Sequence, residues 1–358
     1  MELYLNGFVA SFLLTALITP FVWLAARRWR LLDWPDERKI HRFPVPRLGG
    51  VAIYLSLLAS ALIFLPDGHL LALLLPATAI FLLGLWDDLF GLAPAVKLAG
   101  QVGAALLLVA LGVKIQFLTN PLGGMIFLGP WALPATLFWV VSVTNVVNLT
   151  DGLDGLAAGV AFIVAAALFS VALSMDQAGI ALWTAILGGA TLGFLPYNFN
   201  PAKIFLGDSG AMLIGFMLAA LAAEGALKGA TAVALLVPTV ALGVPILDTA
   251  FAIVRRFWQG RPIYRPDREH LHHRLLSLGL SQRQAVAVIY AVSAFLGGVA
   301  VVLARQGGDY PFFWSLFGVA AGMVWLAKVF GLLELEGTEP KLSWEGRGGR
   351  RPWGMRSR

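Results

Sequence analysis

The chain has 358 residues, of which 59% are hydrophobic and 13% are charged, and it contains no cysteine. A soluble domain is about half apolar and about a quarter charged, so this composition excludes a soluble enzyme, a disordered chain and a disulfide scaffold. It indicates one helical domain that crosses a bilayer many times. The net charge of +6 is typical of the cytoplasmic loops of a membrane protein and does not indicate nucleic acid as a partner.

Apolar runs of about 15–25 residues recur along the chain and predict eleven transmembrane helices. The runs cover residues 3–26, 48–66, 70–86, 98–113, 131–147, 156–175, 179–196, 209–223, 230–247, 285–304 and 312–327. Residues 114–130 hold the turn dipeptides Asn-Pro and Gly-Gly between short β-prone stretches, which predicts a small outer β-hairpin. We expect an all-α membrane domain over residues 1–330 and a polar, disordered tail over residues 331–358.

The Lys and Arg residues predict the orientation of these helices. With the N-terminus outside, Lys114, Lys228 and Arg305 fall on outer segments, and the other 23 of the 26 basic residues fall on inner segments. Positive charge gathers on cytoplasmic loops. We therefore expect the N-terminus outside, the C-terminus inside, and a multi-pass protein of the inner (plasma) membrane.

Six aspartates lie at the predicted inner ends of the helices. They are Asp87 and Asp88 after the third run, Asp151 and Asp154 in NLTDGLDGL, Asp208 in NPAKIFLGDSG, and Asp248 after the ninth run. Because the orientation rests on Lys and Arg alone, this agreement is independent evidence for one acidic face. Such a cluster repels itself without a cation, and oxygen ligands in a chain without cysteine favour Mg²⁺, or Mn²⁺, bound together with substrate phosphates.

Taken singly, each aspartate has a structural alternative. The pair Asp87 and Asp88 is equally typical of a solvated helix end, and Asp208 is equally typical of an ordinary N-cap. Asp248 is also placed to pair with Arg255 or Arg256. The gathering of all six on one face is what favours a functional site.

Two inner loops carry candidate phosphate-binding residues. The loop at residues 255–284 gathers Arg261, Arg265, Arg268, His270, His272, His273 and Arg274. Its arginines disfavour a zinc site and favour a phosphate site, and a basic loop that touches anionic lipid is the alternative. In the first inner loop, Arg38, Lys39 and His41 are candidates for a lipid phosphate, with ordinary positive-inside charge as the alternative.

An acidic inner face flanked by arginines implies a phosphorylated substrate, and the membrane setting implies that one substrate is a lipid. Five groups of motifs extend this interpretation. In chain order they are DWPDERKIH with PVPRLGG, GLWDDLFGL with Lys97 and Gln101, NLTDGLDGLAAG, YNFNPAKIFLGDSG, and REHLHHRL. Together they resemble the polyprenyl-phosphate N-acetylhexosamine-1-phosphate transferase family. The resemblance implies a bundle of ten or eleven helices with a cytoplasmic Mg²⁺ site.

The resemblance also implies roles for the candidate residues. Asp87, Asp88, Asp151 and Asp208 would be catalytic; Asp208 would be the main Mg²⁺ ligand, with Asp87 and Asp151 beside it, and Asp87 and Asp88 would position or deprotonate the lipid phosphate. The nucleotide would contact Asn148, Asp151, Asp154, Lys97 and Asn198. The sugar and diphosphate would contact His270, His272, His273, Arg265 and Arg268, and the lipid phosphate would contact Arg38, Lys39 and His41. The active site would be formed by the inner loops 27–47, 87–97, 148–155, 197–208 and 248–284.

The histidines distinguish branches of this family. The peptidoglycan branch carries three consecutive histidines followed by Phe-Glu, whereas this chain has His270, Leu271, His272 and His273 followed by Arg274. This order resembles the branch that transfers GlcNAc-1-phosphate from UDP-GlcNAc to undecaprenyl phosphate, the first membrane step of O-antigen, common-antigen or teichoic-acid-linkage synthesis. Direct attack by the lipid phosphate and a covalent phospho-enzyme on an aspartate both stay open. A homodimer is implied by the resemblance alone.

Three alternatives accompany this interpretation. Within the family, the chain would be a phospho-MurNAc-pentapeptide transferase of peptidoglycan synthesis. An ion-coupled secondary transporter would keep its ionisable groups near the bilayer midplane and often has inverted repeats, and the sequence shows neither. A non-catalytic lipid-binding scaffold would not need six carboxylates around one site.

Overall fold

The computed structural model describes residues 1–35, 43–65, 69–119, 125–228, 233–258 and 271–305, together with residues 318, 321 and 322. The α-helices are α1 (Glu2–Arg28), α2 (Gly49–Phe64), α3 (His69–Phe90), α4 (Pro94–Ala110), α5 (Ala132–Thr150), α6 (Leu156–Ser174), α7 (Ala178–Asn198), α8 (Gly207–Lys228), α9 (Val233–Ala241), α10 (Gly243–Trp258), α11 (Leu271–Ser277) and α12 (Gln282–Arg305). The strands are β1 (Leu32–Asp33), β2 (Val45–Pro46), β3 (Phe117–Thr119) and β4 (Met125–Phe127), and a 3₁₀ turn, η1, covers Gly129–Trp131.

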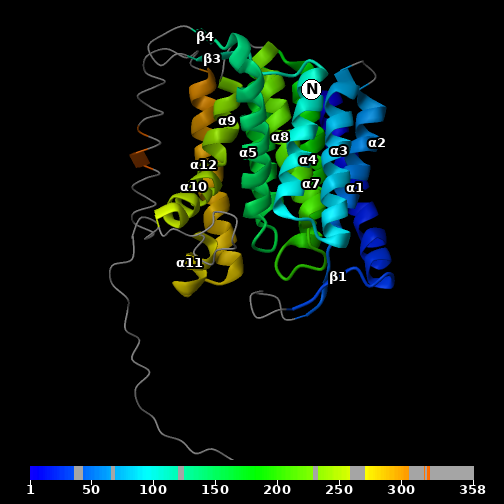
Figure 1. Ribbon diagram of the computed structural model, residues 1–358. Helices are drawn as coiled ribbons and strands as arrows, with labels where there is room; N and C mark the ends of the chain where they lie inside the picture. Colours follow the sequence, from blue (N-terminus) through cyan, green and yellow to red (C-terminus); the bar gives the residue numbers. More distant parts are fainter. Residues whose placement is uncertain are drawn as a thin grey trace, which may run out of the picture.

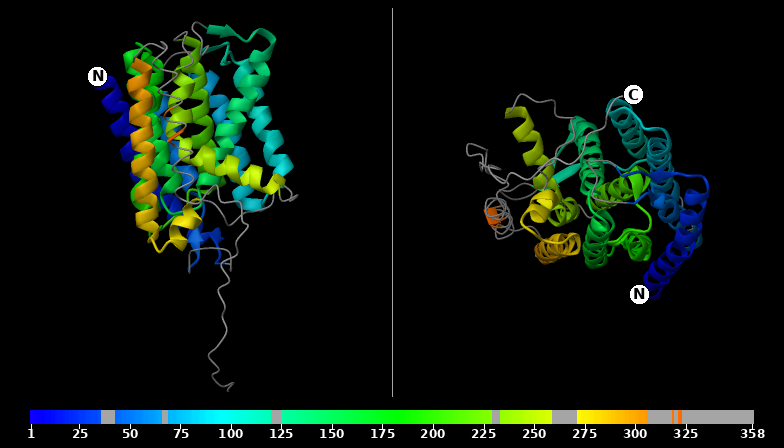
Figure 2. Two further views of the ribbon diagram at one scale, coloured as in Figure 1. Left: turned by 90° about the vertical axis from the view of Figure 1, so that its left-hand side faces the viewer. Right: turned by 90° about the horizontal axis from the view of Figure 1, so that it is seen from below.

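The long helices run side by side between two ends of one bundle (Figure 1). The N-terminus and the strands β3 and β4 lie at one end, here called the hairpin end. The strand β1 and the helix α11 lie at the opposite end, here called the α11 end. Helix α10 is steeply inclined to the others (Figures 1 and 2). Because successive long helices alternate in direction, the segments that join α3 to α4, α5 to α6 and α7 to α8 all fall at the α11 end.

Seven of the described helices are long and apolar enough to cross a membrane: α1, α3, α5, α6, α7, α8 and α12. Three shorter apolar helices accompany them, namely α2, α4 and the first part of α10. The first eight predicted runs and the tenth each correspond to one helix. The predicted eleventh run falls, apart from residues 318, 321 and 322, outside the described residues, as does the predicted tail. These findings support a multi-pass membrane protein, because apolar helices of this length are what a bilayer requires.

The predicted ninth run is wrong as a single helix. In place of one helix over residues 230–247, the structure has α9 and α10, separated at Leu242. The physical reason is Pro245, which has no N–H to donate to the carbonyl of Ala241 and is tolerated only in the first turn of a helix. Helix α10 therefore starts anew at Gly243 and takes a different direction. Asp248 lies inside α10 rather than at the end of a span.

The bundle is organised around α8. The apolar segment of this helix is completely buried, whereas that of α1 is mostly exposed. Helix α8 packs against α2, α3, α5, α6, α7 and α9. Small residues allow the closest approaches, as is usual in membrane bundles. A Cβ atom added to Gly50 would lie 2.2 Å from the backbone nitrogen of Gly210, so α2 and the start of α8 touch backbone to backbone.

The predicted hairpin is confirmed. Strands β3 and β4 pair antiparallel, with Phe117 opposite Phe127 and Thr119 opposite Met125. The sequence did not indicate a second pair, β1 with β2, in which Leu32 faces Pro46 and Asp33 faces Val45. This pair places Asp33 beside Val45 and directs the chain from β2 into α2. Its position places Arg47 at the α11 end, next to the start of α8.

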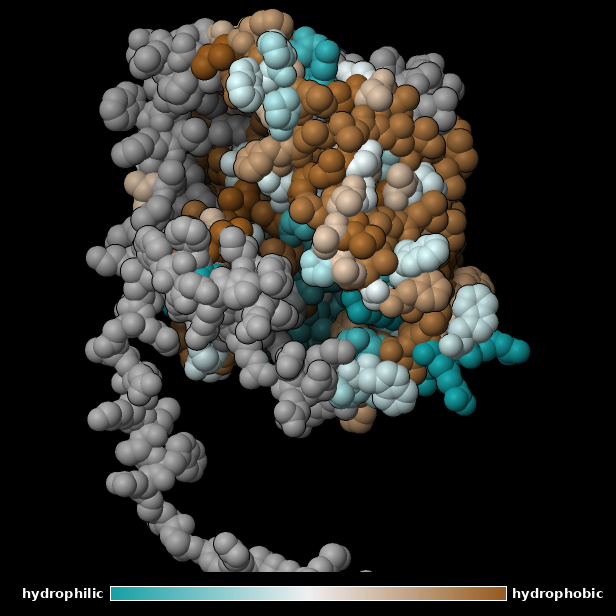
Figure 3. All heavy atoms as spheres, in the orientation of Figure 1, coloured by the Kyte–Doolittle hydropathy of each residue, from teal (hydrophilic) through white to brown (hydrophobic). Residues whose placement is uncertain are grey.

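The surface divides by polarity along the bundle axis. Figure 3 shows apolar side chains along the helices and hydrophilic side chains gathered at the α11 end and just inside it. Exposed residues on the long helices include Leu17, Phe21 and Phe138, which suits a surface in contact with lipid. On the face shown, the largest group of hydrophilic side chains therefore lies where the acidic face is predicted.

We expect Gly50→Ala to destabilise the protein by about 1–3 kcal/mol, the usual cost of overpacking, because its new methyl group would collide with the backbone of α8. Gly103→Ala in α4 is the matched control, since a Cβ atom there meets nothing within 4 Å and alanine favours helix. Thermal unfolding of both variants in detergent measures the difference. Equal melting temperatures for Gly50→Ala and wild type would contradict the close α2–α8 contact.

Candidate active site

The start of α8 is held by the carboxylate of Asp88, at the end of α3. Asp88 Oδ1 accepts a hydrogen bond from the backbone N–H of Asp208 at 2.8 Å. Asp88 Oδ2 accepts one from the N–H of Ser209 at 2.9 Å and one from the Ser209 hydroxyl at 2.6 Å. The first N–H groups of a helix have no partner within the helix, and a carboxylate satisfies them while it complements the helix dipole. The side chain of Asp88 is 0% exposed, so it joins α3 to α8.

The carboxylate of Asp208 lies at the centre of a group of polar side chains. Arg47 binds its Oδ2, and Asp208 Oδ1 accepts hydrogen bonds from Lys97 Nζ at 2.9 Å and from Asn148 Nδ2 at 2.7 Å. These three partners come from the segment after β2, from α4 and from α5. Asp208 keeps 14% of its side-chain surface exposed. It is therefore fixed by three separate segments and still accessible from the α11 end.

Each of the two cations joins two carboxylates. Arg47 Nε lies 3.2 Å from Asp88 Oδ1 while its guanidinium also binds Asp208. Lys97 Nζ lies 2.6 Å from Asp87 Oδ2 and 2.9 Å from Asp208 Oδ1. Asp87 is fixed further by the N–H of Leu92, which donates to its Oδ1 at 2.6 Å. The pattern links Asp87, Asp88 and Asp208 into one network in which every carboxylate has a defined position.

Asp151 follows the last turn of α5 and adds acidic charge to the network. Burial raises the pKa of Asp151 to about 7, and the nearby carboxylate of Asp208 raises it further, while Arg47 opposes the shift. Four carboxylates thus face Arg47 and Lys97, and acidic charge remains in excess. An excess of this kind favours binding of an additional cation.

A pair of amides ties α4 to α5 one turn deeper in the bundle. Asn145 Nδ2 donates to Gln101 Oε1 at 2.6 Å and also to the carbonyl of Val141 at 2.8 Å. Gln101 lies one turn after Lys97 in α4, and Asn145 lies about one turn before Asn148 in α5. The pair therefore sets the spacing of the two helices that bring Lys97 and Asn148 to Asp208.

The turn between α5 and α6, residues 151–155, is here called the acidic turn. Its Asp154 uses Oδ2 to accept hydrogen bonds from Asn200 Nδ2 at 2.9 Å and from the N–H of Ala202 at 3.0 Å. Asn198 is 2% exposed; its Oδ1 accepts the N–H of Gly155 at 3.1 Å and its Nδ2 donates to the carbonyl of Ile204 at 3.1 Å. Asp154 and Asn198 thus bind the acidic turn to the segment that leads into α8.

The structure brings together most of the candidate residues that it describes. Asp87, Asp88, Lys97, Asn148, Asp151 and Asp208 form one network, and Asp154 and Asn198 lie in the adjoining acidic turn and its support. Arg38, Lys39, His41, Arg265, Arg268 and His270 lie outside the described residues. The backbone of His272 and His273 belongs to α11, but their side chains are also outside the described part. Asp248, assigned no role by the resemblance, accepts a hydrogen bond from the N–H of Leu271 at 2.8 Å and so supports α11.

Sequence reasoning missed Arg47. Arg47 has no role of its own in the sequence-based prediction, because it enters there only as part of the motif PVPRLGG and of the positive charge on inner segments. A usable signal was present, because Arg47 directly precedes Leu48 and the Gly49-Gly50 pair that allows α2 to approach α8. The close approach of Gly50 to Gly210 is what carries the guanidinium to Asp208.

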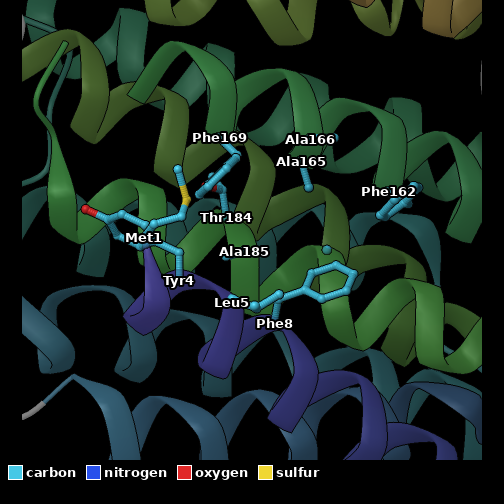
Figure 4. A pocket seen from close by; sticks show the side chains of 11 residues that line it. Met1, Tyr4, Leu5, Phe8, Phe162, Ala165, Ala166, Phe169, Thr184 and Ala185 are labelled. Atoms are coloured by element: carbon cyan, nitrogen blue, oxygen red, sulfur yellow. The ribbon is translucent and has the colours of Figure 1, made fainter. Parts of the chain in front are cut away.

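Two further observations bear on ligand binding. Among the described residues, no three histidine or acidic side chains gather as a ready metal site. A cavity of about 320 Å³ lies near the hairpin end between α1, α6 and α7 (Figure 4). Its lining is almost wholly apolar and includes Tyr4, Phe8, Phe162 and Phe169. It lies at the other end of the bundle from the carboxylates and does not form part of the candidate site.

Comparisons with known proteins agree with the motifs. The family model for glycosyl transferase family 4 matches residues 70–226. A "Probable undecaprenyl-phosphate N-acetylglucosaminyl 1-phosphate transferase" of Bacillus subtilis (strain 168) is 37% identical over 330 residues, which cover 91% of this chain and 92% of the relative. The chain therefore belongs to glycosyl transferase family 4, a family of membrane phosphoglycosyl transferases, and the resemblance drawn from the motifs is confirmed.

Two other relatives show the range of similarity. A "Decaprenyl-phosphate N-acetylglucosaminephosphotransferase" of Mycobacterium leprae (strain TN) is 40% identical over 321 residues, covering 81% of this chain and 80% of the relative. An "Undecaprenyl-phosphate alpha-N-acetylglucosaminyl 1-phosphate transferase" of Escherichia coli (strain K12) is 27% identical over 303 residues, covering 82% of each chain. The similarity extends over most of the length of both chains.

We expect Arg47→Gln to lower transferase activity by about 100-fold or more, a usual loss when one preorganised charge is removed from an active site. The substitution leaves Asp88 and Asp208 without their shared cation. Arg47→Lys should recover only part of the activity, because an ammonium group cannot replace a guanidinium that binds two carboxylates. Steady-state rates of folded protein measure both variants. Full activity of Arg47→Gln would show that this bridge is dispensable.

Proposed function

We propose that this protein transfers GlcNAc-1-phosphate from UDP-GlcNAc to undecaprenyl phosphate, forming undecaprenyl-diphosphate-GlcNAc and releasing UMP. The observation that carries the proposal is the carboxylate of Asp208, which Arg47, Lys97 and Asn148 reach from three segments at one end of a membrane bundle. The names of the relatives support a polyprenyl phosphate acceptor and transfer of a GlcNAc-phosphate group.

In the proposed reaction, an oxygen of the lipid phosphate attacks the phosphorus that carries the sugar. The bond from that phosphorus to the bridging oxygen breaks, and UMP leaves with that oxygen and its electron pair. Phosphoryl transfer depends mainly on positioning and on neutralising charge. Arg47 and Lys97 hold positive charge beside Asp208, and each can exchange one carboxylate partner for a phosphate oxygen of the substrate.

Mg²⁺, or Mn²⁺ in its place, is the cofactor that we propose. The donor set fits such an ion, because it consists of carboxylate oxygens and acidic charge is in excess around Asp151. Mg²⁺ commonly takes one or two carboxylates and completes its shell with water and substrate phosphates, so a ready group of three acidic ligands is not required. Asp208, Asp87 and Asp151 would hold the ion. A bound ion would supply positive charge to the diphosphate.

Of the two mechanisms, we favour direct attack over a covalent phospho-enzyme. A nucleophilic aspartate must reach the donor phosphorus, but the side chain of Asp88 is 0% exposed and both its oxygens accept hydrogen bonds from the start of α8. Asp87 is engaged by Lys97 and by the N–H of Leu92. In our proposal, Asp88 therefore acts through Arg47 and Ser209, as a positioning residue.

The remaining contacts belong to the same proposal. The sugar and diphosphate would be held by His270, His272, His273, Arg265 and Arg268, and the lipid phosphate by Arg38, Lys39 and His41. The position of α11 at the same end as Asp208 (Figure 1) supports the first of these assignments. The asymmetry of Lys and Arg supports an inner-membrane protein whose site faces the cytoplasm. A homodimer is carried over from the resemblance.

The assay that tests this function uses purified protein in detergent with undecaprenyl phosphate and Mg²⁺. UDP-GlcNAc and UDP-MurNAc-pentapeptide are supplied in parallel, and UMP release is followed with and without EDTA. We expect release from UDP-GlcNAc alone and its loss with EDTA. Release from UDP-MurNAc-pentapeptide alone would move the protein to the peptidoglycan branch, and no release from either by folded protein would overturn the proposed donor.

We expect Asp208→Asn to lower UMP release by about 100-fold or more, because the neutral amide keeps the size of the side chain but not its charge. The stabilisation of wild type by UDP-GlcNAc with Mg²⁺, measured as a thermal shift, should also disappear. The matched control is Asp176→Asn, an exposed residue at the hairpin end whose φ of 55° asparagine tolerates. Turnover of Asp208→Asn equal to that of this control would refute the role of Asp208.

A further inference from the structure

We propose that Tyr290 and Gln282 of α12 are positioning residues for the transfer reaction, because they hold the acidic turn in place. This inference rests on the proposed function. Neither residue belongs to the carboxylate network, and α12 supplies none of its members. The contacts of α12 nevertheless converge on the acidic turn and on Asn200, its support.

The first contact is the hydroxyl of Tyr290. It donates a hydrogen bond to the carbonyl of Gly155 at 2.6 Å. Gly155 ends the acidic turn and begins α6 with a left-handed φ of 83°. The N–H of the same residue donates to Asn198 Oδ1. The peptide groups on both sides of Gly155 are therefore fixed, one by α12 and one by α7.

The ring of Tyr290 lies directly over α6. A Cβ atom added to Gly159 would lie 2.0 Å from the Tyr290 hydroxyl oxygen and 2.1 Å from Cζ. A side chain at position 159 would therefore displace the ring and withdraw its hydroxyl from Gly155. Because Gly159 has no side chain, Tyr290 of α12 can reach the acidic turn.

The second contact passes through Asn200. Asn200 Nδ2 lies 2.6 Å from Gln282 Oε1 and 2.9 Å from Asp154 Oδ2. Arg283 Nε donates to the carbonyl of Asn200 at 2.9 Å. The first turn of α12 thus holds the amide that in turn holds Asp154. With Tyr290, it supports both Asp154 and Gly155, and Asp151 lies only three residues before Asp154.

These contacts also connect two parts of the proposed site. Helix α11, with His272 and His273, ends five residues before α12 begins, and α11 packs against α12. A shift of α11 therefore reaches the acidic turn through Gln282, Arg283 and Tyr290. Turns held only by local contacts are mobile, and a displacement of about 1 Å in an active site costs up to about 100-fold in rate. Fixing this turn from α12 aligns Asp151 with Asp208.

The test compares Tyr290→Phe with Tyr54→Phe. Both tyrosines are partly buried, and each uses its hydroxyl for one hydrogen bond. Tyr54 of α2 contacts Thr78 of α3 at 2.9 Å, away from the acidic turn. Tyr290→Phe keeps the ring and removes only the bond to Gly155. We expect kcat to fall on the order of tenfold with little change in melting temperature or in the KM for undecaprenyl phosphate. Tyr54→Phe should behave like wild type.

Hydrogen exchange supplies a readout that does not depend on turnover. In Tyr290→Phe, the amides of Gly155 and Gly159 should exchange faster, while those of α8 keep their protection. Gln282→Ala should raise exchange at Ala202, whose N–H donates to Asp154. Unchanged kcat together with unchanged exchange at Gly155 would overturn the inference, as would a uniform loss of protection with a lower melting temperature, which indicates a structural role alone. If wild type releases no UMP, the proposed function fails, and exchange by itself decides whether α12 holds the turn.

Discussion

The structure depends on one buried carboxylate. Asp88, at the end of α3, accepts hydrogen bonds with both carboxylate oxygens from the first turn of α8. The first N–H groups of a buried helix have no partner within the helix, and an unmatched buried group of this kind costs free energy. Asp88 solves that problem and at the same time attracts Arg47. The residue that follows Gly207, Asp208, is thereby presented at a fixed point facing the open end of the bundle.

The charges around Asp208 have two uses that follow from the same geometry. Arg47 and Lys97 each join two carboxylates, which offsets part of the repulsion between acidic groups that lie close together. These partners are ionic and partly exposed, so in the proposed reaction an incoming diphosphate would compete for them. A site that is stabilised by its own ion pairs in the absence of substrate would then already be arranged for phosphate. The hydrogen bond from Asn148 would maintain the position of Asp208 during such an exchange.

Much of the site was predictable because charged side chains have a high free-energy cost in an apolar environment. An aspartate near the end of a membrane helix is costly without a role, so Asp87, Asp88, Asp151 and Asp208 were visible in the sequence, and so was Lys97 from its motif. The positive-inside rule explains any single basic residue, so only the position of Arg47 just before Gly49 and Gly50 sets it apart from ordinary loop charge. The amides Gln101, Asn145 and Asn200 carry no charge, and tyrosine is common in membrane helices, so their contacts depend on knowing which helices are neighbours.

The sequence by itself determined the class of protein, the positions of the first eight apolar segments and the tenth, the hairpin and the chemical identity of the acidic face. Those features follow from composition, the length of apolar runs and local turn chemistry, which are properties of neighbouring residues. The tertiary structure decided which aspartate each cation joins, that Pro245 separates α9 from α10, and that Tyr290 reaches the acidic turn across a residue without a side chain. Those features depend on which helices, far apart in the sequence, pack against one another. At Gly50 and Gly159, the lack of a side chain allows two elements to approach closely, and a single added methyl group would prevent it.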